Sequence, residues 1–283
     1  MEFEFHTRRP GPALEPFVEA VWFARGQITY RRERIAPTGS TVAVIVLGSP
    51  ILQVPRNGAG EPLLATEGWL AGPHEGPVIN SPTAETLAVG VVSTPVGCRA
   101  VFGVDPAPLR GRVVELARCW PAATALRAAL SARLSGSAPV GPEGALALVE
   151  AALLATLQPE VTGWRRCAAA VEALEADPRR PVAAIAAELG VSHAHLDREF
   201  ERVVGLAPKE LGRILRLRRL LNGLDVHGDV RWSAVAAEWG WFDQSHFIRD
   251  FKRHTGVTPS GYVRAQRAAF AVGQAAGGFV PEL

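Results

Sequence analysis

Two spacings of apolar residues divide the chain into a first part typical of β-structure and a longer helical part. Up to about residue 103, short apolar runs alternate with Gly and Pro, as in residues 41–50 and 86–93. Runs bounded in this way by turn-forming residues predict strands. We expect strands at about residues 20–25, 27–35, 41–47, 50–54, 67–71, 77–80 and 86–93. Short strands in this number predict a β-sandwich or a small barrel.

From about Asp105 onward, apolar residues recur every three to four positions, which is the period of a helix. Helices are therefore expected at residues 108–117, 122–134 and 142–157. The last of these carries an apolar face made of Leu146, Val149, Leu153, Leu154 and Leu157.

The last part of the chain predicts a short helix, a glycine turn and a second helix. Ser233 is a suitable cap for the first helix, and Gly240 ends it, because glycine adopts the left-handed conformation of a sharp turn. Asp243 caps the second helix, where Phe247 and Phe251 share an inward face. The opposite face carries Gln244, Ser245, Ile248, Arg249 and Lys252. This is a helix-turn-helix, whose second helix enters the major groove, and Arg and Gln suit contacts with base edges.

The same arrangement occurs earlier in the chain. Residues 181–192 repeat the helix, the glycine and the capping hydroxyl, and residues 193–204 form the next helix. Phe200 corresponds to Phe251, at an offset of 51 residues. This internal duplication places two reading helices in one chain. Pro208 begins a long helix between them, which would fix their spacing to match major grooves about 34 Å apart.

The second unit and its continuation resemble a known family. Residues 240–253 (GWFDQSHFIRDFKR), followed by residues 256–259 (GVTP), are similar to the C-terminal DNA-binding domain of the AraC/XylS family of bacterial transcription regulators. The resemblance covers about residues 163–270 and implies seven helices, two helix-turn-helix units and a joining helix. Phe242 and Ile248 stand where the family usually has polar side chains, so contacts there are expected to be apolar or absent.

By position, the resemblance implies which side chains face DNA. The expected base-facing residues are Ala194, His195, Asp197 and Arg198 in the first unit, and Gln244, Ser245, Ile248 and Arg249 in the second. The whole chain has a net charge of only +2, but residues 198–219 hold seven basic residues against three acidic ones. Their position between two reading helices favours phosphate contact. The expected phosphate contacts are Ser192, Arg202, Lys209, Arg216, Asp243, Lys252 and Arg253.

The resemblance also implies a division of the chain into a sensor and a DNA-binding domain. We expect an effector-binding domain, cupin-like or a small barrel, a helical connector, an all-α DNA-binding domain and a tail: residues 1–103, 104–160, 161–272 and 273–283. Trp22, Trp69 and His74 are candidate pocket residues, although aromatic side chains in small β domains also form the core. Because connector helices in this family often pair two chains, the leucine face at 146–157 is a candidate homodimer surface. Packing of that face on the β-rich domain is the alternative.

The remaining chemistry of the sequence is sparse. No metal-ligand spacing, phosphate-binding Gly loop or nucleophile–base–acid set is found, so we expect no catalysis, cofactor or metal. Cys98, Cys119 and Cys167 are scattered, which fits reduced thiols. No apolar run reaches about 18 residues, and no signal segment is evident, so a cytoplasmic protein without membrane contact is expected.

The sequence thus predicts a sequence-specific regulator that binds double-stranded promoter DNA. We expect an activator that contacts RNA polymerase and is controlled by a small-molecule effector, whose identity the sequence leaves open. The alternative is an enzyme or DNA-repair protein fused to the same DNA-binding domain. That alternative requires a reactive cysteine in an electropositive setting or a metal cluster.

Overall fold

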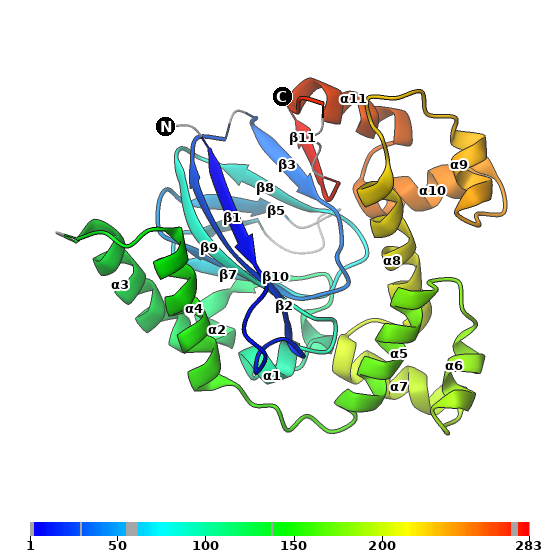
Figure 1. Cartoon of the computed structure of the whole chain (residues 1–283), viewed down its shortest axis with the longest axis horizontal. Coiled ribbons are helices and arrows are strands. Elements are labelled where there is room, and N and C mark those ends of the chain that lie inside the picture. Colours follow the sequence, from blue (N-terminus) through cyan, green and yellow to red (C-terminus); the bar gives the residue numbers. More distant parts are fainter. Residues whose placement is uncertain (1–2, 29, 55–61, 137, 273–276, 283) are drawn as a thin grey trace.

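The computed structural model of the chain has an N-terminal β-rich domain and a C-terminal helical domain that lie side by side (Figure 1). It describes residues 3–28, 30–54, 62–136, 138–272 and 277–282. The fold class predicted from the sequence is confirmed: two sheets are followed by helices and then by an all-α domain. None of the helices in these described ranges is long and apolar enough to cross a membrane.

The described strands form two antiparallel sheets. The first sheet has the order β1 (Glu4–Arg8), β2 (Val18–Gly26), β9 (Thr86–Ser93), β4 (Val42–Val46), β7 (Gly68–Ala71) and β10 (Val113–Glu115). The second has the order β11 (Phe279–Glu282), β3 (Arg32–Ile35), β8 (Val78–Pro82), β5 (Ile51–Val54) and β6 (Leu63–Ala65). Each strand predicted between residues 20 and 93 overlaps an observed one. The strand expected at 27–35 is shorter, since β3 begins at Arg32, and residue 29 lies outside the described residues.

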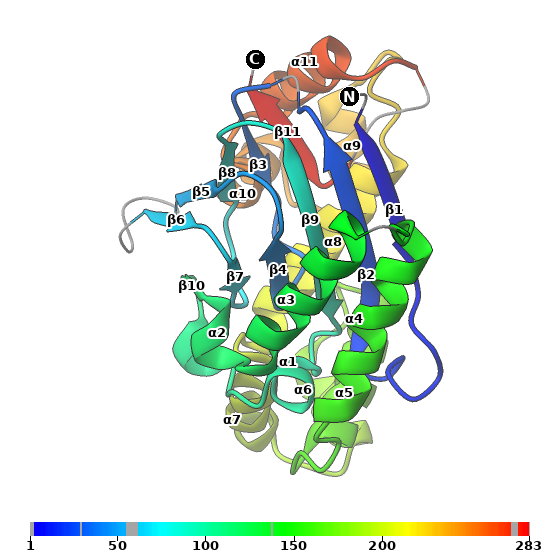
Figure 2. The same cartoon turned by 90° about the vertical axis from the view of Figure 1, so that its left-hand side faces the viewer.

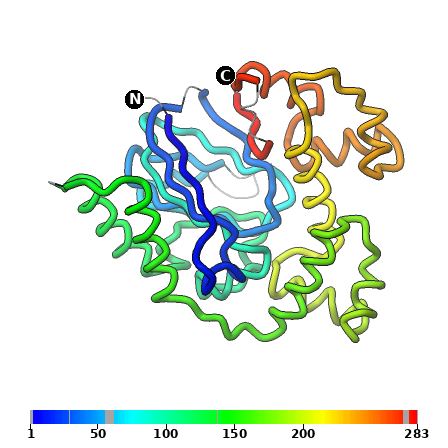
Figure 3. Tube along the Cα trace, viewed as in Figure 1, coloured from blue at the N-terminus to red at the C-terminus, as the bar shows by residue number. Residues whose placement is uncertain are grey.

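Strand β11 comes from the segment expected to be a tail, residues 273–283. Its described residues pair antiparallel with β3, with Phe279 opposite Ile35, and Val280 is buried. Residues 273–276 and 283 lie outside the described residues. Figure 3 shows the red C-terminal segment lying beside a blue N-terminal strand. A strand that follows the helical domain in sequence therefore completes a sheet of the β-rich domain.

The connecting helices cover the first sheet. They are α1 (Cys98–Phe102), the 3-10 turn η2 (Ala107–Leu109), α2 (Leu116–Cys119), α3 (Ala122–Ser135) and α4 (Pro142–Thr156). The helix predicted at 108–117 is wrong, because Gly111 has a φ of 68° and interrupts it, and the β-branched Val113 and Val114 extend the sheet at β7. The helices predicted at 122–134 and 142–157 are confirmed as α3 and α4.

The apolar face of α4 packs on the β-rich domain. Leu146, Val149 and Leu153 are fully buried in the same core as strand β2 and helix α3. Figure 2 shows α3 and α4 together in front of the first sheet. The prediction of a dimer surface is therefore wrong for these three residues, since they are already covered within the chain, and the packing alternative holds. Of that face, Leu154 is 49% exposed.

The helical domain contains seven helices in the described residues. They are α5 (Trp164–Ala176), α6 (Val182–Glu188), α7 (His193–Val204), α8 (Pro208–Gly223), α9 (Trp232–Glu238), α10 (Gln244–Thr255) and α11 (Pro259–Ala269). We call α6–α7 the first unit and α9–α10 the second unit. The inward Phe200 belongs to the core of the first unit, and Phe247 and Phe251 belong to the core of the second.

Helix α8 takes part in both of these cores. Its first half contributes Leu211, Ile214 and Leu215 to the core of the first unit. Its second half contributes Leu217, Leu220 and Leu221 to the core of the second unit. Because the helix is rigid and buried at both ends, it fixes the distance between the two units.

Arg216 attaches the second unit to α8. Its side chain is 13% exposed, forms an ion pair of 3.2 Å with Asp250, and lies 4.0 Å from the centre of the Trp241 ring. Its Nη1 also donates to the carbonyl of Gly240 at 3.1 Å, and Trp241 donates to the same Asp250 oxygen at 3.1 Å. Burial lowers the pKa of Arg216, and Asp250 opposes that effect. The guanidinium of Arg216, which was predicted to contact phosphate, thus already has partners within the protein.

We expect Arg216→Ala to destabilise the second unit. The substitution leaves the Asp250 carboxylate half-buried without its cation, and losing one partner of such a pair costs about 3 kcal/mol. Urea unfolding measures the change, with Arg219→Ala, an exposed arginine on the same helix, as the matched control expected to stay within about 0.5 kcal/mol. Equal effects of the two substitutions would contradict this role of Arg216.

Candidate DNA-binding surface and interior cavity

Local capping sets the start of both reading helices, α7 and α10. Ser192 accepts a hydrogen bond from the His195 amide at 3.2 Å, and Asp243 accepts one from the His246 amide at 2.7 Å. Both were predicted to contact phosphate, and both side chains are engaged in capping. The turns before the two helices contain Gly190 and Gly240, with φ of 68° and 74°. The predicted left-handed turn at Gly240 is confirmed.

The start of α9 differs from the prediction. Ser233 is not the cap, because the helix begins at Trp232 with Arg231 at the cap position and no side-chain cap. The Trp232 ring stacks on Phe247, with ring centroids 5.7 Å apart. The start of α9 is therefore fixed by packing of the Trp232 ring into the core, and no hydroxyl side chain caps the helix.

The predicted base-facing residues differ in how freely they face solvent. Ala194, His195, Arg198, Gln244, Ser245 and Arg249 are exposed. Asp197 is half-buried, and its Oδ2 lies 3.5 Å from Nε2 of His193. Nε2 of His195 lies 3.0 Å from Nη1 of Arg166. Ile248 is half-buried because it packs against the core of the second unit, so its apolar character serves packing. Arg198 and Arg249 form no ion pair or hydrogen bond with any described side chain, which leaves both available.

The predicted phosphate contacts also divide into free and engaged groups. Lys209 and Lys252 are exposed and form no ion pair with the described residues. Arg202 donates to the carbonyl of Thr162 at 2.7 Å. Arg253, near the end of α10, pairs with Glu75 of the β-rich domain.

Glu75 connects the β-rich domain to α10 directly and to α8 through Arg110. Its carboxylate pairs with Arg253 and, at 2.6 Å, with Arg110, which also pairs with Glu210 of α8 at 2.7 Å. The main-chain oxygen of Glu75 contacts Nδ1 of His254. Burial raises the pKa of Glu75, but Arg110 and Arg253 outweigh it and hold that pKa below its usual range. Burial lowers the pKa of His254.

Other residues of the β-rich domain also pack closely against the helical domain. A Cβ atom at Gly39 would lie 2.3 Å from Cδ1 of Leu211, so the loop before β4 packs directly on α8. Glu19 of β2 pairs with Arg218 of α8. Beside α10, a surface hollow has one wall formed by Arg249, Lys252 and Arg253 of the helix. Its other wall is formed by residues of the β-rich domain, which include Arg34, Pro77 and Ile79.

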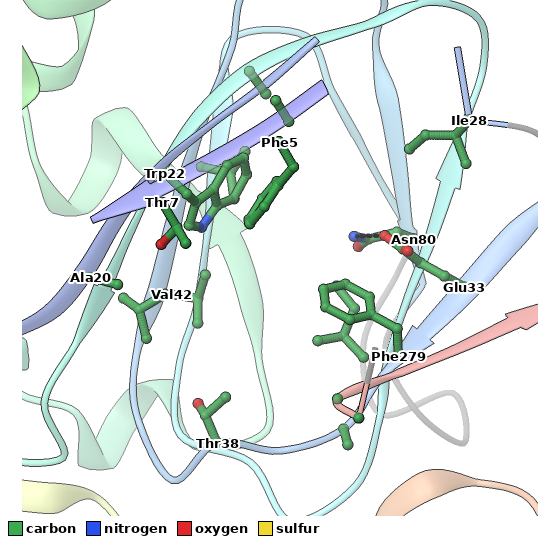
Figure 4. A pocket seen from close by; sticks show the side chains of 18 of the residues that line it. Phe5, Thr7, Ala20, Trp22, Ile28, Glu33, Thr38, Val42, Asn80 and Phe279 are labelled. Atoms are coloured by element: carbon green, nitrogen blue, oxygen red, sulfur yellow. Dashed lines mark hydrogen bonds between the residues drawn. The ribbon is translucent and has the colours of Figure 1, made fainter. Parts of the chain in front are cut away.

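A cavity of about 570 Å³ lies between the two sheets and extends to α8. Of the predicted pocket residues, Trp22 and Trp69 line it. His74 does not: its Nδ1 contacts the carbonyl of Gly72 at 2.8 Å, and burial lowers its pKa. Figure 4 shows the interior, with Trp22 and Phe5 facing Asn80 across the cavity.

The polar residues of this cavity were not predicted from the sequence. Glu33 is 6% exposed, and its carboxyl oxygens accept hydrogen bonds from Tyr30 Oη at 2.7 Å and Asn80 Nδ2 at 3.1 Å. The alternation of β3 (RERI) could have revealed it, because Glu33 shares a strand face with Ile35, while Arg32 and Arg34 point away and pair with Glu282.

Burial disfavours the thiolate form of all three cysteines. Burial raises the pKa of Cys98 and of Cys167 to about 12, and burial also raises that of Cys119. A thiol with a raised pKa stays protonated at neutral pH and is a poor nucleophile. In the described part of the chain, no group of three potential ligands is arranged to hold a metal ion. The features that the fused-enzyme alternative requires are thus not found among the described residues.

Comparisons with known proteins agree with this architecture. A family model described as a helix-turn-helix domain matches residues 185–265, and one described as a domain of unknown function (DUF6597) matches residues 6–115. No curated protein matches the chain.

Several solved structures are similar to the chain. ToxT from Vibrio cholerae matches over 93% of this chain and 98% of its own, with 12% identity and a TM-score of 0.49. The same protein with an unsaturated fatty acid bound matches over 92% of this chain and 94% of its own, with 13% identity and a TM-score of 0.46. A transcriptional regulator with an AraC-type DNA-binding domain from Chromobacterium violaceum matches over 38% of this chain and 96% of its own, with 28% identity and a TM-score of 0.33.

The helix-turn-helix match begins in α6 and ends in α11, so it includes both units and α8. It contains the motif at residues 240–253 and the copy 51 residues before it. Both copies fold as a short helix, a glycine turn and a capped helix with an exposed polar face. Residues 185–265 therefore form a double helix-turn-helix domain of the AraC type, the kind found in DNA-binding transcription regulators.

Proposed function

We propose that this regulator binds promoter DNA through α7 and α10 and responds to a small molecule held in the cavity between the sheets. The observation that carries the proposal is that α8 lines the cavity, through Leu217, Arg218 and Leu221. The same helix contributes to the cores of both units. A molecule in the cavity would thus touch the element that sets the spacing of the two reading helices.

For the DNA contacts, we propose that Arg198 and Arg249 read base edges in two successive major grooves. Both arginines are exposed on the outer faces of their helices and make no ion pair with described residues. An arginine fork can donate two hydrogen bonds to one guanine. The free ammonium groups of Lys209 and Lys252 would contact phosphates, which fixes the position of the protein on DNA without selecting a sequence.

For the control of binding, we propose that the docked β-rich domain restrains the second unit. Arg253 cannot pair fully with a phosphate while Glu75 holds it, and Pro77 and Ile79 stand beside the DNA-facing side of α10. An effector that favours a different packing of α8 against the sheets would shift the population toward a state with α10 released. The predicted activator role, the contact with RNA polymerase and the homodimer are part of this proposal and rest on the family resemblance alone.

The base-reading role can be tested on duplexes selected from a random pool. We expect Arg198→Ala and Arg249→Ala each to cost about 1–3 kcal/mol on the selected sequence and to relax one base position, with little change on random DNA. Lys252→Ala is the matched control, since loss of a phosphate contact weakens all sequences alike. Affinities measured at one fixed salt concentration decide the matter. Equal loss on selected and random DNA for Arg249→Ala would falsify the base-reading role.

The restraint can be tested by Glu75→Gln, which removes the ion pairs with Arg110 and Arg253. We expect the effector-free variant to bind DNA about fivefold or more tightly, the lower end of typical coupling between sites. The control is Glu143→Gln, which removes an ion pair of 2.6 Å with Arg8 away from α10 and accounts for the change in total charge. Titrations of a labelled duplex give both affinities. If both variants bind like the unaltered protein, Glu75 does not restrain the second unit.

A further inference from the structure

The cavity contains a buried carboxyl group that the protein leaves without a cation. Both oxygens of Glu33 accept hydrogen bonds, from Tyr30 and Asn80, so their surroundings suit the ionised form. Within the described ranges, no Lys, Arg or His forms an ion pair with Glu33. Figure 4 shows the Glu33 and Asn80 side chains directed toward one another on one wall, with Phe279 beside them.

The other charges of the cavity do not compensate for Glu33. The charged residues that line it are Glu19, Glu33 and Arg218, and Arg218 already pairs with Glu19 near α8. Burial raises the pKa of Glu33, and the hydrogen bonds from Tyr30 and Asn80 oppose that effect. A buried charge is costly unless an opposite charge lies against it. The unmatched charge of the cavity is therefore negative.

The walls around this carboxyl group are aromatic and aliphatic. Rings of Phe5, Trp22, Tyr30, Trp69 and Phe279 line the cavity together with aliphatic side chains from both sheets. The Phe5 and Trp22 rings lie 5.7 Å apart. Aromatic faces attract cations, particularly where water is excluded.

Glycine at position 90 is what lets the Trp22 ring lie across strand β9. A Cβ atom there would lie 2.1 Å from Cε2 of Trp22. Because glycine lacks that atom, the Trp22 ring can pack against β9, and it lies on the other side of the cavity from Glu33 (Figure 4). The site is thus a carboxylate on one wall, a tryptophan on the other, and apolar surface between them.

We propose that the effector is a lipophilic amine or ammonium compound, with its cationic group against Glu33 and its apolar body between the sheets and α8. This rests on the proposed function, in which the cavity holds the effector. The volume of about 570 Å³ lies within the range of small-molecule sites. A ligand carboxylate would bring a second negative charge toward Glu33, so anionic compounds of the same shape are disfavoured.

The test compares three probes with the same apolar chain: decyltrimethylammonium, decanol and decanoate. Calorimetric titration of the full-length protein measures each affinity, and Trp22 and Trp69, two of the seven tryptophans, contribute a fluorescence signal that responds to the cavity. We expect the ammonium compound to bind about tenfold or more tightly than the other two, as for a desolvated pair of opposite charges. In Glu33→Gln that preference disappears while decanol still binds. The matched control, Glu19→Gln, removes the other acidic group of the cavity and keeps the preference.

The comparison of probes in the unaltered protein does not depend on whether a variant folds. Absence of ammonium binding, equal or tighter binding of decanoate, or a preference that survives Glu33→Gln would overturn the proposal. DNA titrations of the same proteins separate it from the proposed function. If another probe changes DNA affinity while the ammonium compound does not, the cavity remains an effector site and the ligand class is wrong. If DNA affinity responds to no probe, although the ammonium compound binds through Glu33, the control of DNA binding by the cavity is wrong and the ligand class holds.

Discussion

The rest of the structure depends on the packing of α8, which is buried against both helix-turn-helix units and also lines the cavity of the β-rich domain. Its leucine and isoleucine side chains complete the cores of both helix-turn-helix units, and two of them also close the cavity of the β-rich domain. Close packing makes such a helix respond as a unit, because a shift at one face leaves voids or clashes at the others. The spacing of the reading helices and the shape of the cavity are therefore set by the same side chains.

The sequence predicted best those features that depend on neighbouring residues. The caps Ser192 and Asp243 and the apolar strands follow from residues that lie close together in the chain. Strands β1, β6, β10 and β11 were not predicted, and the last two pair with strands far away in the sequence, β7 and β3. A short sheet edge has no periodic pattern of its own.

The contrast between neighbouring residues and distant partners also explains which features of the candidate site were predicted from the sequence. Exposure of Arg198 and Arg249 followed from helical periodicity, which gives the outer face of each helix. The ion pairs of Arg216 with Asp250 and of Arg253 with Glu75 are tertiary contacts, which the spacing of residues along the chain does not predict. Glu33 was missed because a carboxylate between two arginines is typical of a solvated strand, although it shares a strand face with the apolar Ile35.

Strand β11 affects how the molecule is made as well as how it is held together. The edge of β3 stays unpaired until the ribosome has added residues 279–282, after every helix of the DNA-binding domain. An unpaired edge can associate with other chains, so the β-rich domain depends on a strand that follows the helical domain to protect this edge during synthesis. Main-chain hydrogen bonds between β3 and β11 also hold the end of the chain, which packs on α11, against the β-rich domain.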